Sequence, residues 1–168
     1  MDEPLFDRLS TVNVRATSTR FLAKEHFALN MDPGGKVMIS YILDNFQHWF
    51  SEKAEEPIGE TTLCSRELQR NASDAVILAE LGERNVETTL TEVFSLMDSQ
   101  RRGEPGILSI NGWGNIFYIR DVSNVLRAVD CHWCDGGWNI EASRIGRLVE
   151  WPIRDRIVTR GLPDTSRP

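Results

Sequence analysis

The last third of the chain constrains the fold most, because short apolar runs alternate there with turn residues. Five of these runs are typical of strands: residues 107–110, 115–120, 125–133, 138–142 and 156–160. The first four are separated by segments typical of hairpin turns, namely Asn111-Gly112, Val122-Ser123-Asn124 and Asp135-Gly136-Gly137. Consecutive antiparallel pairing is the simplest topology for strands in this order. The pattern therefore predicts an antiparallel β-meander.

The chain before residue 106 has a mixed pattern. Strands are predicted over residues 11–16, 21–29 and 36–43. The last of these has apolar residues on both faces, which predicts a central place in a sheet. A short helix over 44–53 would begin at Asp44 as its N-cap. A second helix is predicted over 65–81, with a break near residues 71–73 where Asn71 or Ser73 could cap its second half.

A third helix has the clearest start signal in the chain. Thr89 and Glu92 have the spacing of a capping box, in which each side chain accepts a hydrogen bond from the other residue's backbone N–H. Apolar residues follow at helical spacing: Leu90, Val93, Phe94 and Met97. We expect this helix to end before Gly103.

Length and composition fit one domain. The chain has 168 residues, of which 40% are hydrophobic, and a chain of this length can bury roughly 70% of its surface. We therefore expect a single α+β domain over residues 1–168, with N-terminal strands and two or three helices packed on a C-terminal antiparallel meander. Residues 1–105 would be the mixed part, 106–160 the sheet and 161–168 a frayed tail.

Composition also narrows the compartment and the partners. The first twenty residues lack an apolar signal region, and the longest aliphatic run, residues 76–79, is far too short to span a membrane. The chain has three cysteines, a small and odd number that argues against a secreted disulfide scaffold. We expect a cytoplasmic protein with no membrane partner. Because the formal net charge is −6, nucleic acid is a disfavoured partner.

Tryptophans in the last third are the strongest sign of recognition. Trp113 lies in a predicted turn, Trp133 and Trp138 flank a hairpin tip, and Trp151 precedes Pro152. Indoles combine a large apolar surface with a polar tip, which suits them to binding surfaces. The leading hypothesis is a binding domain for a protein or small ligand, and the residues expected to contact it are Trp113, Trp133, Trp138, Trp151, Arg127 and Arg144. The structural alternative is a cross-strand pair of Trp133 and Trp138 that stabilises the hairpin.

A zinc-stabilised module is one alternative. Cys131 and Cys134 have the spacing of a zinc knuckle. In a strand their side chains would point to opposite faces, so they converge only if the turn begins at His132. Because the sequence offers no second ligand pair, we expect no metal and no cofactor.

A small hydrolase is the other alternative. A nucleophilic Cys131 or Cys134 would need a histidine from elsewhere, such as His26 or His48. Acid–base hydrolysis would instead use Asp130 and Glu141, which flank one hairpin and could face each other across it. Such a pair would have a raised pKa if it were buried. Solvated carboxylates are the commoner explanation, so binding is expected rather than catalysis.

Overall fold

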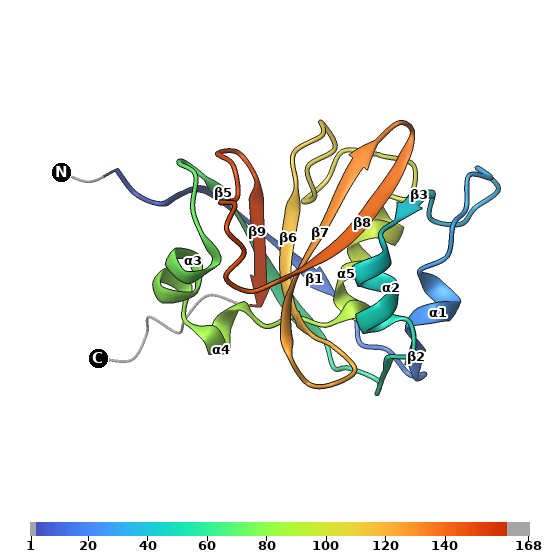
Figure 1. The fold of residues 1–168 in the computed structure, drawn as a ribbon. Helices are drawn as coiled ribbons and strands as arrows, with labels where there is room; N and C mark the ends of the chain where they lie inside the picture. The colour runs from blue at the N-terminus through green and yellow to red at the C-terminus, as the bar shows by residue number, and fades with distance from the viewer. Residues whose placement is uncertain (1–2, 161–168) are drawn as a thin grey trace.

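The computed structural model describes residues 3–160, and its main element is a mixed seven-stranded sheet. In chain order its strands are β1 (Phe6–Val14), β3 (Ile39–Ile42), β5 (Thr61–Leu68), β6 (Asn115–Arg120), β7 (Leu126–Cys134), β8 (Gly137–Arg144) and β9 (Arg156–Arg160). Their order in space is β1-β5-β9-β6-β7-β8-β3 (Figure 1). Two short strands, β2 (Phe21–Leu22) and β4 (Ala54–Glu55), pair separately.

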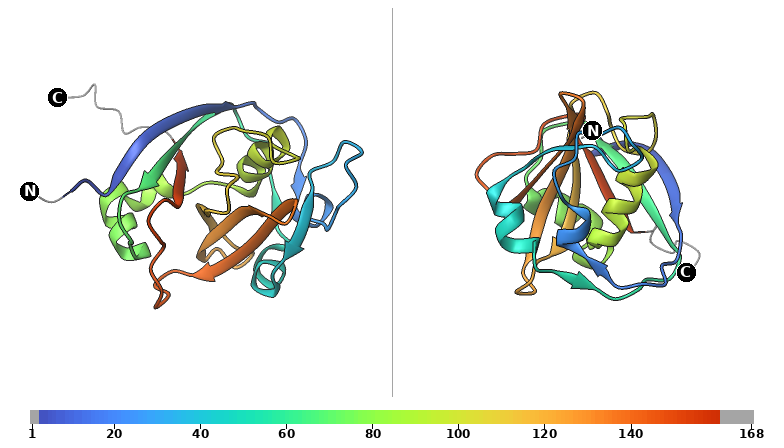
Figure 2. Two further views of the ribbon diagram at one scale, coloured as in Figure 1. Left: turned by 90° about the horizontal axis from the view of Figure 1, so that it is seen from above. Right: turned by 90° about the vertical axis from the view of Figure 1, so that its right-hand side faces the viewer.

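Helices cover both faces of the sheet. The larger core lies between one face and the helices α1 (Ala23–His26), α2 (Asp44–Phe50) and α5 (Leu90–Ser99). The sheet curves around α5, which lies on its concave side (Figure 2). A smaller core lies on the other face, where α3 (Asp74–Leu81) and α4 (Glu83–Val86) contribute Ile77 and Val86. The protein is therefore α+β, as predicted.

The predicted all-antiparallel meander is wrong for the sheet as a whole. β6, β7 and β8 do pair consecutively and antiparallel. β9, however, lies parallel to β6, and β3 lies parallel to β8. The N-terminal strands β1 and β5 extend the same sheet beyond β9. The reason is the connection over residues 145–155, which crosses from β8 past β7 and β6 (Figure 1). Turn residues predict which strands form hairpins, but they carry no information about such a crossover.

The helix predicted over 65–81 is correct only in its second half. Residues 65–68 belong to β5, which pairs with β1 on one side and β9 on the other. The helix propensity of this segment is overridden by two ladders of backbone hydrogen bonds. The helix α3 then begins after Ser73, whose hydroxyl accepts a hydrogen bond from the Val76 N–H, as a capping residue should.

Four smaller predictions need correction. The strand predicted as central, 36–43, is the short edge strand β3. It pairs with β8 alone in the sheet. Its side chains Ile39 and Ile42 are buried because they belong to the larger core. Residues 21–29 form β2 and α1 instead of one strand, and residues 107–110 form no strand. Asp44 lies in the first turn of α2, after the N-cap residue Leu43.

The capping box at the start of α5 is confirmed. The Thr89 hydroxyl accepts a hydrogen bond from the Glu92 N–H at 3.2 Å, and Glu92 Oε1 accepts one from the Thr89 N–H at 3.0 Å. The predicted tail 161–168 lies outside the described residues. Among the described residues, no helix has the length and apolar character needed to cross a membrane.

Candidate functional site: an acidic groove

The four tryptophans of the predicted binding face lie on different sides of the sheet. Trp138 is completely buried in the larger core, where its Nε1–H donates to the Gln100 carbonyl at 3.1 Å. Trp133 lies opposite Trp138 in the β7–β8 register, with an edge-to-face contact at 5.4 Å between ring centroids. Trp113 and Trp151 instead line a groove together. The contacts of Trp133 and Trp138 are those of a cross-strand pair.

The two predicted arginine anchors lie away from that groove. Arg127 stacks on the Trp49 ring at 3.8 Å and pairs with Asp121 at 2.8 Å. Arg144 is exposed and lies opposite Arg127 in the register. Because side chains alternate along a strand, Arg127 shares the face of Val129 and Cys131, which belong to the larger core. The six predicted residues therefore do not form one surface.

The groove that contains Trp113 and Trp151 has a volume of about 280 Å³, and we call it the acidic groove. Its carboxyl groups come from Asp130, Glu141 and Asp155. The remaining lining residues are Gly112, Trp113, Gly114, His132, Arg147, Trp151 and Pro152. Asp130 of β7 and Glu141 of β8 are direct partners in the register, as the sequence had suggested, and His132 follows on the same face of β7. The groove thus combines the predicted Asp130–Glu141 pair and the predicted Trp113 and Trp151 with residues that the sequence did not indicate.

Backbone N–H groups hold two of the carboxylates. Asp155, just before β9, accepts a hydrogen bond from the Gly114 N–H at 2.8 Å. Asp130 accepts one from the Asn115 N–H at 3.2 Å. A Cβ atom on Gly114 would lie 2.8 Å from Asp130 Oδ1 and 3.0 Å from Asp155 Oδ2. Only glycine at this position lets both carboxylates approach the same stretch of backbone.

Burial and mutual repulsion disfavour the ionised form of two carboxyl groups in the groove. Burial raises the pKa of Asp155 from 3.8 to about 6; the Gly114 N–H opposes this, and the negative charge of Asp130 adds to it. The pKa of Glu141 is also raised, by burial and by Asp130. His132 Nδ1 lies 3.5 Å from Asp130 Oδ2, and this contact raises the pKa of His132. Nearby positive charge comes from Arg147 and, when protonated, His132.

A buried carboxylate outside the groove positions Trp151. Asp74 Oδ1 accepts hydrogen bonds from the Trp151 Nε1–H at 2.7 Å and from the Tyr118 hydroxyl at 2.8 Å. Its Oδ2 accepts one from the Gly146 N–H at 3.2 Å. Burial, with the nearby Asp74 charge, raises the pKa of Tyr118, which keeps this hydroxyl a donor. The guanidinium of Arg147 lies 3.8 Å above the Trp151 ring, at the edge of the groove.

The cysteine hypotheses do not fit the geometry. β7 continues through Cys134, so the turn does not begin at His132 and the side chains of Cys131 and Cys134 lie on opposite faces. Burial raises the pKa of the Cys131 thiol, and the charge of Asp135 raises that of Cys134, whereas a nucleophilic cysteine needs a lowered pKa. Within residues 3–160, no three His, Cys, Asp or Glu side chains are grouped so that they could hold a metal ion.

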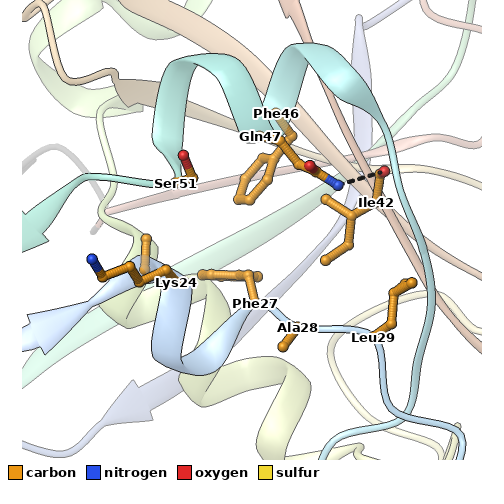
Figure 3. Close-up of a pocket in the computed structure, with 9 residues that line it drawn as sticks. Lys24, Phe27, Ala28, Leu29, Ile42, Phe46, Gln47 and Ser51 are labelled. Atoms are coloured by element: carbon orange, nitrogen blue, oxygen red, sulfur yellow. Dashed lines mark hydrogen bonds between the residues drawn. The ribbon is translucent and has the colours of Figure 1, made fainter.

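A second concave region has a different character. A pocket of about 220 Å³ lies between α1 and α2, and Figure 3 shows Phe27, Ile42 and Phe46 around it. Among its lining residues, Gln47 Nε2 donates a hydrogen bond to the Ile42 carbonyl, and Lys24 carries a charge at the edge. The acidic groove is the better candidate, because several polar groups converge there.

Asp155 and Arg147 are the groove residues that sequence reasoning missed. Asp155 and Asp130 are far apart in the chain, and only the crossover over residues 145–155 brings them together. No local pattern around either residue signals this. In comparisons with known proteins, no protein-family model, curated protein or solved structure matches the chain.

Proposed function

We propose that this protein is a binding protein and that the acidic groove takes a cationic group of its partner, a guanidinium or an ammonium. One observation carries the proposal: three carboxyl groups, two of them with a raised pKa, line one open groove beside two indoles. Such carboxyl groups lack a full counter-charge. A cation placed among them would supply it and would gain from each carboxylate that ionises.

The aromatic walls favour the same class of ligand. Cations bind over the faces of tryptophan rings, and Trp is the best of the aromatic residues for this contact. The groove already contains an internal example, because Arg147 lies over the Trp151 ring. The guanidinium of Arg154 also lies over a groove indole, 6.0 Å from the centre of the Trp113 ring. The pKa values of Asp155 and Glu141 are raised even with these arginines nearby, which favours binding of a further cation. A phosphate-bearing partner would be repelled by these groups.

The proposal predicts a preference for charge and a defined pH dependence. The peptide acetyl-Gly-Gly-Arg-Gly-Gly-amide should bind more tightly than its citrulline counterpart, which has the same shape without the charge. Since Asp155 loses its proton near pH 6, affinity should rise between about pH 5 and 7.5. Deprotonation of Glu141 adds negative charge to the groove, and deprotonation of His132 removes positive charge from it. Both therefore also raise the affinity for a cation as the pH rises. Calorimetric titration at several pH values measures this.

Variants assign the effect to the groove. Asp155→Asn should weaken binding of the arginine peptide about tenfold, the effect of losing one charge-assisted contact, and should flatten the pH dependence. Glu60→Gln, at an exposed position outside the groove, is the matched control and should bind as the unchanged protein does. Equal affinities for the arginine and citrulline peptides would rule the proposal out.

Acid–base hydrolysis is a second candidate, favoured by the pKa of Asp155 near 6. A general acid works best when its pKa is close to the working pH, and Asp130 lies beside Asp155 as a second carboxyl group. This candidate predicts turnover of chromogenic glycosides, with a pH–rate profile that breaks near pH 6. The Asp155→Asn variant should lose that turnover. If the unchanged protein binds the arginine peptide but hydrolyses none of the glycosides, binding alone remains.

A further inference from the structure

An exposed apolar segment borders the acidic groove. Leu148, Val149 and Ile153 have relative solvent exposures of 102%, 67% and 44%. They lie on the crossover between β8 and β9, which also supplies the groove residues Arg147, Trp151 and Pro152. Within residues 3–160, none of the three belongs to either hydrophobic core or packs against one. We call Leu148, Val149 and Ile153 the apolar rim.

The backbone of the rim is held in place. Trp151 and Ala72 exchange two backbone hydrogen bonds, at 2.8 and 3.0 Å. The Ile153 N–H donates to Asn71 Oδ1 at 2.8 Å, and Arg147 Nε donates to the Val149 carbonyl at 2.8 Å. Before the rim, the Gly146 N–H donates to Asp74 Oδ2 at 3.2 Å. The segment is therefore anchored at both ends while its apolar side chains are exposed to solvent. An anchored segment loses little freedom when a partner covers it, which favours binding.

We propose that the apolar rim and the acidic groove form one docking surface for a partner protein, which places a basic side chain in the groove and an adjacent apolar side chain on the rim. This inference rests on the function proposed above and specifies its partner. Exposed apolar groups beside a polar site are typical of protein interaction surfaces. Charge favours a protein partner. The crossover carries Arg147 and Arg154, but the groove holds three carboxyl groups and the formal net charge of the chain is −6, so an anionic membrane or a nucleic acid would be repelled and a basic protein segment would be attracted.

Matched peptides separate the two halves of the surface. The first is acetyl-Gly-Gly-Arg-Gly-Gly-amide, and the second is acetyl-Leu-Gly-Arg-Gly-Leu-amide. We expect the leucines to increase affinity up to about tenfold, because they bury apolar surface on the rim. This gain should disappear in Leu148→Ser and Val149→Ser, whose exposed side chains are not needed for folding. Val122→Ser, at an exposed valine in the β6–β7 turn, should retain the full gain.

The possible outcomes separate this inference from the proposed function. If the arginine peptide binds but the leucines add nothing, or add as much in Leu148→Ser, the docking surface is overturned and the cation groove stands. If the leucine gain is lost in Leu148→Ser while arginine and citrulline peptides bind equally, both proposals are overturned. Binding to phosphatidylcholine–phosphatidylserine vesicles that is lost in Leu148→Ser would assign the rim to a membrane and overturn the protein partner.

Discussion

Replacing Asp74 by alanine is expected to lower the free energy of unfolding by about 3 to 5 kcal/mol. The carboxylate is buried and accepts hydrogen bonds from Trp151, Tyr118 and the Gly146 N–H. Alanine would leave these buried donors without an acceptor, and each unsatisfied buried donor costs about 1 to 3 kcal/mol. Urea denaturation followed by circular dichroism measures the change.

The same substitution should affect the groove. Without Asp74 the Trp151 ring loses the hydrogen bond that holds its edge, so affinity for the arginine peptide should fall even where the variant is fully folded. Asp74→Asn keeps one oxygen for Trp151 and Tyr118. Its free energy of unfolding and its affinity for the arginine peptide should lie between those of the unchanged protein and those of Asp74→Ala. Glu80→Gln, at an exposed position of the same helix α3, is the control. A stability change below about 1 kcal/mol for Asp74→Ala would contradict this account of Trp151.

Replacing Glu92 by alanine is expected to cost about 3 to 5 kcal/mol of stability, because it removes the buried carboxylate that accepts hydrogen bonds from the Thr61 hydroxyl, the Thr89 N–H and the partly exposed Arg160. Glu92 is fully buried and accepts hydrogen bonds from Arg160 Nε and Nη2 at 2.8 to 3.1 Å. It also accepts one from the Thr61 hydroxyl at 2.9 Å and the one from the Thr89 backbone that completes the capping box. One side chain thus joins the start of α5 to β5 and β9.

A double-mutant cycle separates these roles. Glu92→Gln retains oxygen for the capping box and loses the charge that faces Arg160, so it should cost less than Glu92→Ala. In the Arg160→Ala background, the cost of Glu92→Gln should shrink, because the carboxylate charge then has no cation to pair with. The free energies of unfolding of the unchanged protein, the two single variants and the double variant supply the coupling energy. A coupling energy of zero would contradict a contribution of the Glu92–Arg160 contact to stability.

Some of the candidate site could be predicted because it depends on one hairpin. The two-residue Asp135-Gly136 turn sets the β7–β8 register, and that register places Asp130 opposite Glu141. It also places Trp133 opposite Trp138. What could not be predicted was which of these pairs faces solvent, because both faces of the sheet are covered over part of their area by helices distant in the chain.

The sequence by itself determined the structures whose contacts span only a few residues. The capping box of Thr89 and Glu92 and the hairpins of β6, β7 and β8 are of this kind, since their partners are near neighbours in the chain. For the cap of α3 the sequence left Asn71 and Ser73 open, and the structure has Ser73. Only the tertiary structure decided that residues 65–68 extend between β1 and β9, and that Asp155 joins Asp130. These outcomes depend on burial and pairing between distant segments, whose free energies no local pattern contains.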